Sequence, residues 1–579
     1  IIMFIHKFLT LFVTLASANV FLQNPRGSNN RYNSANDNVQ NQARMFRSWN
    51  DARGGYNVGE PMYYYMDSLL EIEWTNSMSC GTGAEDKVAC DIILQYMCSP
   101  WLNDGKDENT VTLENWEEMT GESYKYGFHE DPWYYGDCNV RERNKNLFLA
   151  DQTLNGETAS FTRQNPSGSR YGFECAEERE YYPYWHPSPW RDIAVFTDDQ
   201  SRCDMYVSES QNTAPKGFCK SDPISNRRDT CPTGDWSEGM SHGIESPECL
   251  PTPFNRANHL GNTLGGYPNR YTWKIPYVSE EERENCAIRI RYNVSAPKEV
   301  PWELNYTSNE DLAQVVTYYK SRGVKSPVVK DPYQMFAGSN ISYALDTRWH
   351  GAATYQDRSH RFMVRERPTG ITNRIHNLNV RGKRGNIVET FPATEYDFVP
   401  EVLTMKKNEF LHPQWTGTDQ NTANAAGEGT DQTDRNNMVQ IRNLNENYPI
   451  DFGEQDLFTD EEAMRIAFGG MQYYATRCKS LGELLSSNNN DDEIEEDVFN
   501  CGKMNLGTPY FDGGLQAMRK TGTFYYMSTR NNNYTNRSQK GTIIVQDCSE
   551  KECPYQEVEE AAAPRAIMAI SAIFVSLFF

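Results

Sequence analysis

Residues 239–243 (GMSHG) carry a hydroxyl and an imidazole in a spacing that is typical of hydrolases, with Ser241 at the nucleophile position of a G-x-S-x-G pattern. The pattern works when a strand leads through a tight turn into a helix, which exposes the serine. Here the preceding residues have loop composition, and Pro247 and Pro251 prevent a helix of any length from following. We therefore interpret the match as accidental and predict no catalytic residue in it.

Aromatic side chains in loop-like sequence form a second candidate site. Aromatic residues make up 12% of the chain, and aromatic faces beside carboxylates are what a saccharide-binding site uses. The candidates for stacking on a glycan are Tyr184, Trp185 and Trp190. The alternative is that these rings form a core where regular structure is scarce.

Histidine and cysteine are not spaced as metal ligands. The chain holds nine histidines and no C-x-x-C pair, and His129, His186, His242 and His259 lie far apart in the sequence. Scattered histidines more often satisfy local hydrogen bonds than bind a metal. We therefore predict neither a metal nor another cofactor.

Two segments of the first half have the period of β-strands. In residues 88–98, apolar side chains and cysteines alternate along one face. Residues 287–294 alternate in the same way, and we expect Ile288 and Ile290 to be buried while Arg289 and Arg291 point outward.

The predicted strands of the second half are short and separated by turn signals, which indicates a β-sandwich. Residues 381–384 (RGKR) match a proprotein-convertase site but lie between strand patterns, so we interpret them as a hairpin tip. The strands are expected at residues 361–365, 387–391, 396–399, 402–405, 523–527 and 542–545.

Helices are expected at two places. Ser308 and Asp311 resemble a capping box before a helix over residues 308–322. A second helix is predicted from Thr459, with Glu462 as its capping partner and glycines 469 and 470 as its end. The acidic, Asn-rich residues 486–497 are interpreted as a solvated loop.

The 14 cysteines form two even groups, ten between Cys80 and Cys286 and four between Cys478 and Cys553. Even groups are expected when each domain closes its own disulfides in an oxidising compartment. The spacing leaves the pairing open. We predict disulfides for all of them: Cys80, Cys90, Cys98, Cys138, Cys175, Cys203, Cys219, Cys231, Cys249, Cys286, Cys478, Cys501, Cys548 and Cys553.

Both ends of the chain carry targeting patterns. Residues 1–18 combine basic residues, a short apolar run and a small-residue cleavage pattern, which predicts a secretory signal peptide and a mature chain from Asn19. The uncharged apolar tail of residues 566–579 favours a glycosylphosphatidylinositol (GPI) anchor signal, with a short tail anchor and a buried terminal helix as alternatives. Sequons predict N-glycosylation on exposed loops at Asn293, Asn305, Asn340, Asn533 and Asn536.

The charge balance excludes several classes of protein. The chain has 56 Lys and Arg against 79 Asp and Glu, a net charge of −23, which argues against a nucleic-acid partner. The mean hydropathy of −0.74 argues against a multi-spanning membrane protein. Membrane contact is therefore expected only through a C-terminal anchor.

These patterns together predict a mainly β protein with a few helices, in which a disulfide-rich β domain precedes a β-sandwich. The expected segments are a signal peptide (1–18), an Asn/Arg/Gly-rich arm (19–59), the disulfide-rich domain (60–307), a helix with connecting strands (308–385), the sandwich (386–548) and a processing or anchor segment (549–579).

The sandwich resembles a cupredoxin domain. The resemblance rests on residues 410–415 (FLHPQW), 522–528 (GTFYYMS) and 541–545 (GTIIV), and it extends over about residues 387–545. It implies the closing strands of a cupredoxin-like fold.

The ligands of a cupredoxin copper site are missing, however. Such a site needs two histidines, a cysteine thiolate and usually an axial methionine. The sandwich offers His412 and Met527, but residues 527–530 (MSTR) stand where the cysteine and histidine should be, and no histidine follows His412. We therefore expect no copper site and place Met527 in the core.

A longer resemblance covers nearly the whole mature chain. Residues 24–31 (NPRGSNNR), 53–59 (RGGYNVG), 182–190 (YPYWHPSPW) and 379–385 (NVRGKRG) are similar to a eukaryotic family typified by a developmentally expressed, O-glycosylated secreted protein of social amoebae, with relatives in aquatic invertebrates. The resemblance implies secretion and glycosylation, and it implies no catalytic activity for any residue.

We therefore expect a secreted, glycosylated protein, extracellular or GPI-anchored at the cell surface, that serves as a structural or binding protein without catalysis. Its expected partner is an extracellular protein, a glycan or further copies of itself. The alternative is a secreted carbohydrate-binding or carbohydrate-active protein, with copper-dependent oxidation as its chemistry. Enzymes of that kind bind copper through an N-terminal histidine, whereas cleavage after Ala18 exposes Asn19.

Overall fold

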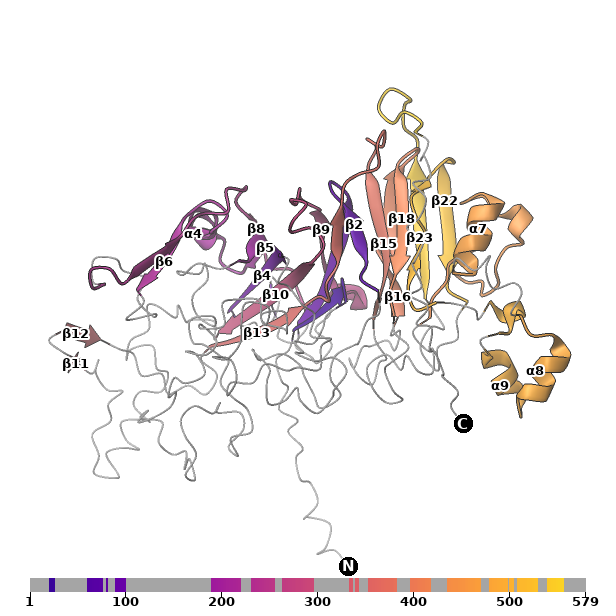
Figure 1. The fold of residues 1–579 in the computed structure, drawn as a ribbon, viewed down its shortest axis with the longest axis horizontal. Coiled ribbons are helices and arrows are strands. Elements are labelled where there is room, and N and C mark those ends of the chain that lie inside the picture. The colour runs from indigo at the N-terminus through magenta and orange to yellow at the C-terminus, as the bar shows by residue number, and fades with distance from the viewer. Residues whose placement is uncertain are drawn as a thin grey trace, which may run out of the picture.

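The computed structural model describes the chain in sixteen segments, most of which lie in strands or in the turns between them. Figure 1 shows two strand-rich halves side by side, the first including β4, β5 and β10 and the second including β15, β18 and β22. The described residues are 20–26, 60–76, 80–81, 89–99, 189–219, 231–255, 263–295, 333–336, 339–342, 352–382, 396–417, 435–469, 478–497, 499–504, 508–529 and 539–556.

The first half is a sandwich of two sheets. In one sheet β3 (Leu69–Asn76) pairs antiparallel with β1 (Val20–Asn24) and β9 (Asn269–Lys274). The other has the order β13-β10-β4-β5-β8. The core between them includes Trp74 and Ile288, both fully buried. The strands of the second sheet are β4 (Ala89–Cys98), β5 (Arg191–Thr197), β8 (Glu248–Pro251), β10 (Cys286–Ser295) and β13 (Ala352–Arg358).

The second half is a further sandwich. β15 (Ile375–Gly382) pairs with β16 (Tyr396–Val399) and β18 (Phe410–Trp415). Opposite them lies a sheet of order β17-β23-β22-β19, and Leu378, Trp415 and Tyr526 belong to the core between the two. That sheet and the short strands beside β18 comprise β17 (Val402–Lys406), β19 (Val439–Ile441), β20 (Phe511–Asp512), β21 (Gln516–Ala517), β22 (Gly522–Met527) and β23 (Lys540–Gln546).

The two sandwiches share one sheet. Its order is β1-β3-β15-β18-β20, with β9, β16 and β21 as further members. The link between the halves is the parallel contact of β3 with β15, in which Leu69 stands beside His376. We call the contact of β2 and β3 with the strands of the second half the seam. β2 comprises Tyr63–Tyr65 and pairs in parallel with β14 (Met363–Arg365).

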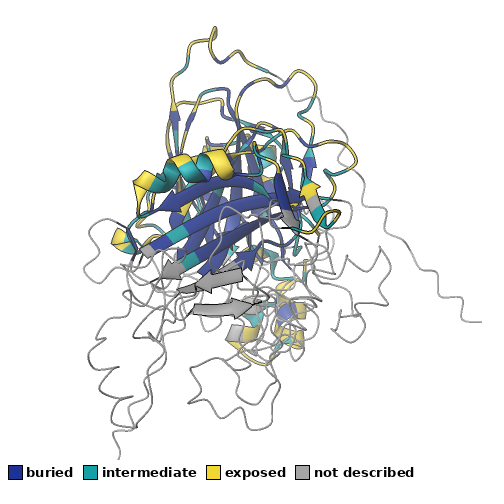
Figure 2. Cartoon of the chain, turned by 90° about the vertical axis from the view of Figure 1, so that its left-hand side faces the viewer, coloured by how far each residue is buried: buried dark blue, intermediate teal, exposed yellow. Residues whose placement is uncertain are grey.

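The remaining elements lie outside these sheets. Figure 2 shows that the strands are largely buried, whereas exposed residues lie in loops and helices around them. Among the described residues, no helix is both long and apolar enough to cross a membrane. These elements are α4 (Cys203–Glu209), α7 (Asp460–Ala467), α8 (Leu481–Ser487), α9 (Asp491–Glu496), β6 (Lys216–Cys219), β7 (Trp236–Gly239), β11 (Tyr333–Phe336), β12 (Ser339–Ser342) and the 3-10 turns Gln200–Arg202, Leu264–Gly266, Phe452–Glu454 and Cys501–Lys503.

The predicted fold class is confirmed, and so are most of the predicted strands that fall on described residues. The helix predicted from Thr459 is α7, and its capping box with Glu462 is present. Its end is also as expected, because Gly469 adopts a positive φ of 60°. The predicted helix over residues 308–322 and the strand over 387–391 lie outside the described residues.

The solvated loop predicted over residues 486–497 is wrong. These residues form the end of α8 and all of α9. Ser480 and Glu483 make a capping box for α8, and the Asn490 side chain accepts from the Glu493 N–H at the start of α9. Asn and Ser followed by Glu three residues later are strong helix starts. The high charge of the segment hid that signal.

The outward orientation predicted for Arg289 and Arg291 is also wrong, since both are 1% exposed. β10 lies inside its sheet between β4 and β13. The Arg289 guanidinium lies 4.2 Å from the ring centre of Trp190 and donates to Gln95 Oε1 at 2.8 Å. The polar side of this strand is therefore covered by other protein groups and not by water.

The hairpin-tip interpretation of residues 381–384 fails at Arg381. This residue lies inside β15, opposite Asp397 of β16. β15 and β16 are paired antiparallel, and residues 383 and 384 lie outside the described residues.

Five disulfides are described, and each joins cysteines of the same group, as predicted. No free cysteine occurs among the described residues. Cys231 is also disulfide-bonded, whereas Cys138, Cys175 and the side chain of Cys219 lie outside the described part of the chain. The pairs are Cys80–Cys90, Cys98–Cys286, Cys203–Cys249, Cys478–Cys501 and Cys548–Cys553.

Candidate functional site

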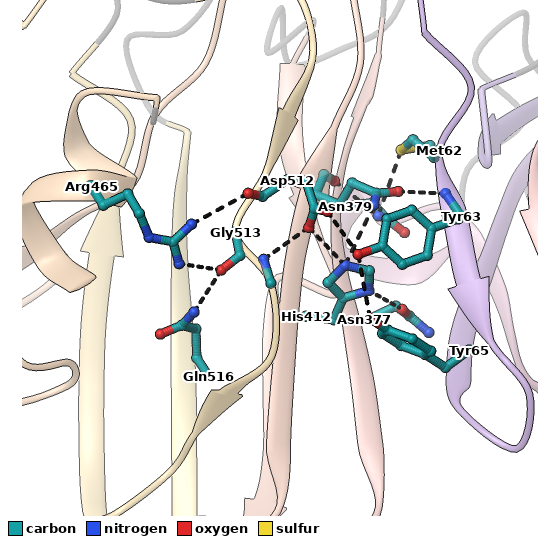
Figure 3. A network of polar contacts seen from close by, with 12 residues as sticks. Met62, Tyr63, Tyr65, Asn377, Asn379, His412, Arg465, Asp512, Gly513 and Gln516 are labelled. Atoms are coloured by element: carbon teal, nitrogen blue, oxygen red, sulfur yellow. Dashed lines mark hydrogen bonds and ion pairs between the residues drawn. The ribbon is translucent and has the colours of Figure 1, made fainter. Parts of the chain in front are cut away.

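Polar and aromatic side chains from both halves meet at the seam, where β2 approaches β15 and β18 (Figure 3). Tyr63 and Tyr65 come from β2, Asn377 from β15, His412 from β18 and Asp512 from β20. The parallel register of β15 and β18 places Asn377 beside His412. Residues that are hundreds of positions apart in the sequence therefore share one site.

His412 is the centre of the network and is fully buried. Its Nε2 lies 3.1 Å from Asp512 Oδ1, and its Nδ1 lies 3.2 Å from Asn377 Oδ1. Asp512 Oδ2 accepts from the Tyr63 hydroxyl at 2.7 Å, and Oδ1 also accepts from the Gly514 N–H at 2.8 Å. Every oxygen of the Asp512 carboxyl thus faces a donor.

The positions of the protons follow from the partners of Asn377. Its amide nitrogen donates to Ser68 Oγ at 2.9 Å and to the Leu69 carbonyl at 2.8 Å, so its Oδ1 is an acceptor. His412 Nδ1 must therefore donate to it. Its Nε2 faces two groups, Asp512 Oδ1 at 3.1 Å and the amide nitrogen of Gln414 at 3.4 Å. Both ring nitrogens of His412 are thus engaged by protein groups.

The electrostatics of the site favour the ionised carboxylate. Burial alone would raise the pKa of Asp512, but the hydrogen bond and charge of His412, with the Tyr63 hydroxyl, hold that pKa well below its usual range. Burial, together with the nearby Asp512 charge, raises the pKa of the Tyr63 phenol, so Tyr63 stays a neutral donor.

Aromatic rings enclose the pair. The ring of Tyr63 lies 4.9 Å from the His412 ring and that of Tyr65 lies 5.5 Å from it, measured between centroids. The Arg365 guanidinium covers the Tyr63 ring at 3.7 Å. Such cation–π contacts are strongest when they are shielded from water. This contact therefore helps to stabilise the interface between the two halves.

On the other side, the loop after Asp512 is fixed to α7. Arg465 donates to the carbonyls of Asp512 and Gly513. Gly513 tolerates no side chain, because a Cβ there would lie 2.5 Å from the Pro413 ring. The network therefore runs from β2 of the first half to α7 of the second (Figure 3).

The residues of the second half do not fit a cupredoxin copper site. Both ring nitrogens of His412 face protein partners, and the cysteines at 478, 501, 548 and 553 are in disulfides and offer no thiolate. Met527, placed in the core from the sequence, is only half-buried at the end of β22. Among the described residues, no three His, Cys, Asp or Glu side chains converge as metal ligands.

The surroundings of Ser241 do not form a nucleophile elbow. β7 ends at Gly239, and residues 240–247 run to β8 without a helix. His242 Nε2 lies 3.2 Å from the Trp190 carbonyl oxygen, and its backbone N–H donates to Gln211. The strand–turn–helix context of a hydrolase is absent between β7 and β8.

The glycan-stacking prediction is wrong for Trp190. Its side chain is 2% exposed and packs with Met97 and Ala287, beneath the guanidinium of Arg289. A ring buried in this way has no free face for a sugar. Tyr184 and Trp185 lie outside the described residues.

The loop placement predicted for the sequons is wrong for two of them. Asn293 is half-buried in β10, paired with Asp91 on one side and Thr354 on the other. Asn340 lies in β12 of a short hairpin. A three-residue pattern carries no information on its neighbours in space. Asn305, Asn533 and Asn536 lie outside the described residues.

Sequence reasoning singled out His412 but missed its partners Asp512, Asn377 and Tyr63. One signal was available, since Asp512 stands before two glycines, as expected for a carboxylate that accepts from a turn amide. No signal within the sequence linked it to Tyr63, which is 449 residues away.

Two solved structures resemble about a third of the chain. Auracyanin A, a "blue" copper protein of the bacterium Chloroflexus aurantiacus, is 12% identical over 30% of this chain and 98% of its own, with a TM-score of 0.12. Auracyanin B is 12% identical over 31% of this chain and 96% of its own, also with a TM-score of 0.12. The search of curated proteins found no match.

Two family models match the chain. One is described as the DD3-3 N-terminal domain and matches residues 18–364, which include every described strand of the first sandwich. The other is described as the DD3-3 cupredoxin-like domain and matches residues 373–545, which confirms the cupredoxin-like fold expected for the second. Since the first model alone matches more than half of the sequence, the chain belongs to the DD3-3 family.

Proposed function

We propose that this protein is a secreted, glycosylated structural or binding protein of the cell surface or extracellular matrix, and that it has no catalytic role. The observation that carries the proposal is the pairing of cysteines. Disulfides are described in both halves of the protein, with no free thiol among the described residues. Disulfides of this number persist in oxidising compartments and are rare in the cytosol.

The candidate site supports a structural role. The Asp512 carboxyl and the His412 ring, which together could move a proton, are held by partners from both halves. A general base must instead face a place where a substrate can approach. These groups thus serve to join the halves, which suits a protein whose task is to present a stable surface.

Glycosylation, anchoring and the choice of partner extend this proposal. The sequons and the apolar tail suit a glycosylated protein attached by a GPI anchor. The partner would be an extracellular protein, a glycan or further copies of the chain. The net charge of −23 favours a partner that is not itself strongly acidic.

Expression of the full chain in secretory eukaryotic cells tests the proposal. We expect the protein in the medium or on the surface, with no thiol that reacts under denaturing conditions, a mass reduced by glycosidase and release by phosphatidylinositol-specific phospholipase C. A matched control is the double variant Leu11→Arg/Leu15→Arg, which breaks the apolar run of the signal and should leave reduced protein inside the cell. Wild-type protein with free thiols in the cytosol would contradict the proposal.

Binding and self-association are measured on the secreted material. Sedimentation velocity reports assembly, and a glycan array reports sugar binding. If a glycan binds by aromatic stacking at Trp185, Trp185→Ala should abolish binding. Trp190→Ala should instead lower the midpoint, because that ring is buried. Turnover of a substrate that a single substitution abolishes without unfolding would overturn the non-catalytic role.

A further inference from the structure

A buried group of three charged side chains crosses the seam. Glu73 comes from β3 of the first half, while Arg381 of β15 and Asp397 of β16 belong to the second. Arg381 Nε lies 3.4 Å from Glu73 Oε2, and a terminal guanidinium nitrogen lies 3.3 Å from Asp397 Oδ2. The side chains are 7%, 17% and 12% exposed for Glu73, Arg381 and Asp397. One buried positive charge thus faces two buried carboxyls.

The hydrogen bonds of this group are incomplete. Glu73 Oε2 and Arg381 Nε make no hydrogen bond within the described part of the chain, and the buried hydroxyl of Tyr526 also lacks one. Asp397 Oδ1 accepts from the Phe398 N–H at 2.9 Å. A buried carboxyl oxygen that lacks a donor is costly when charged and much less so when the carboxyl is protonated.

The groups packed around the three do not supply the missing positive charge. Glu71 of β3 and Glu401, which follows β16, add negative charge. Arg270 of β9 lies opposite Glu73 but is exposed, so water screens it. Arg26 donates to the Val380 carbonyl and covers the Tyr396 ring. Tyr526 of β22 is neutral, since burial and the nearby carboxyls raise its pKa well above the usual value.

We propose that this group is a proton-binding site: either Glu73 or Asp397 carries a proton while the seam is closed, and release of that proton loosens the seam. With one proton bound, the three side chains balance to zero charge. Without it, a net negative charge remains between β3 and β15. A buried charge without a partner carries a desolvation penalty. Separation of these strands removes that penalty because it lets water reach the charge.

The pKa values of both carboxyls are consistent with a proton bound at this site. Burial raises the pKa of Glu73 to about 7, against the opposing charge of Arg381. Burial also raises the pKa of Asp397 to about 7, again against Arg381 and with the help of Glu401. A carboxyl whose pKa is raised in the folded state contributes stability that is complete below its ordinary pKa of about 4 and is lost as the pH rises towards 7.

Two other buried carboxyls, those of Asp512 and Glu409, affect stability in a different pH range. Despite their burial, hydrogen bonds and charge from His412 and His376 lower the pKa values of Asp512 and Glu409, respectively. Asp512 and Glu409 stabilise the folded protein at pH values above their ordinary pKa values, and this stabilisation is lost only as the pH falls below about 4. Between about pH 5 and 7 these two carboxyls are therefore ionised. Burial also raises the pKa of Glu71, which lies beside the group on β3, so substitution of the named carboxyls is needed to assign the proton.

Hydrogen–deuterium exchange on the secreted full chain tests this proposal. The amides to follow are those that bond across the seam: the Tyr63 N–H, which donates to Gln414 Oε1, and the amides of the Leu69–His376 bridge. After correction for intrinsic exchange rates, the equilibrium constant for opening of these amides should rise about tenfold per pH unit between pH 5 and 7, as expected for one released proton. The amides shared by β4 and β10 lie in the other sheet, and their protection should not change. An opening equilibrium of these cross-seam amides that is independent of pH would overturn the proposal.

Substitutions distinguish one shared proton from two independent carboxyls. Glu73→Gln or Asp397→Asn leaves a balanced pair with Arg381, so each alone should flatten the pH dependence. The double variant should also be flat but more open at every pH, because Arg381 has lost both partners. Glu454→Gln, at an exposed pair with Arg442, is the matched control and should behave as wild type. A single variant that keeps the wild-type slope would contradict the shared proton.

A spectroscopic measurement covers the case in which the variants fail to fold. The infrared spectrum of the wild-type protein should show a protonated-carboxyl band at pH 5.5 that disappears by pH 8. No such band at pH 5.5 would exclude the bound proton. A band that Ca²⁺ removes at constant pH would point to a cation site and overturn the proton assignment.

Discussion

At the scale of single residues, Asp512 joins the two halves most directly. Its carboxyl receives hydrogen bonds from the Tyr63 hydroxyl of the first half and from His412 and Gly514 of the second. The site is mostly buried, and removing one member of a buried ion pair leaves the other charge without a partner. We therefore expect this residue to influence stability strongly.

The variant Asp512→Asn should lower the free energy of unfolding by about 3 kcal/mol at neutral pH. It should also flatten the acid side of the stability profile. The pKa of Asp512 is depressed in the folded protein, so its contribution is present above about pH 4 and is lost as the pH falls further. Urea unfolding between pH 2 and 7 measures both effects. Asp451→Asn, at an exposed position, is the control, and an equal loss there would contradict this role.

At the scale of elements, close packing between neighbouring strands determines which positions can carry a side chain. In the antiparallel pair β22–β23, Gly541 stands opposite Tyr526, and a Cβ on Gly541 would lie 2.3 Å from the Tyr526 hydroxyl. The ring of Tyr526 lies 4.8 Å from that of Phe398 in the core. The glycine therefore makes room for a buried aromatic ring.

Two glycine substitutions should have opposite effects. Gly541→Ala forces the Tyr526 ring to shift and should cost about 1 to 3 kcal/mol of stability. Gly482→Ala, in the exposed first turn of α8 with no atom near the new Cβ, should gain about 0.5 kcal/mol from helix propensity. Denaturant unfolding of both variants gives the comparison. If Gly541→Ala proved as stable as wild type, the close packing of β22 on β23 would be refuted.

At the scale of the whole molecule, a shared sheet and disulfides that close long loops hold the protein together. The sheet continues from β1 and β3 into β15 and β18. Cys98–Cys286 joins β4 to β10 and closes a loop with a sequence separation of 188, whereas Cys548–Cys553 closes one of 5. A cross-link restricts the unfolded chain more when its loop is longer.

The disulfides should therefore differ in how much they contribute to the stability of the folded protein. Replacing Cys98 and Cys286 by serine should lower stability by up to about 5 kcal/mol, and replacing Cys548 and Cys553 by about 2 kcal/mol. Thermal unfolding of the secreted variants, with the amount secreted as a second readout, measures the difference. Equal losses would show that the length of the closed loop does not govern their contribution.

The features that the sequence alone determined are local. Alternation predicted strands such as β4 and β10, Thr459 and Glu462 predicted the start of α7, and even numbers of cysteines predicted pairing within each group. Each depends on residues close in sequence or on composition, which is why it could be inferred. The same local reasoning failed where charge concealed the caps at Ser480 and Asn490.

Only the tertiary structure decided which charges are buried and what they contact. Arg289 and Arg381 look like solvent-facing residues in the sequence, yet the first lies against Trp190 and the second between Glu73 and Asp397. The contact between His412 and Asp512 likewise exists because β18 and β20 are neighbours. A periodic pattern specifies a face of a strand but not what covers that face, and the covering groups come from distant parts of the chain.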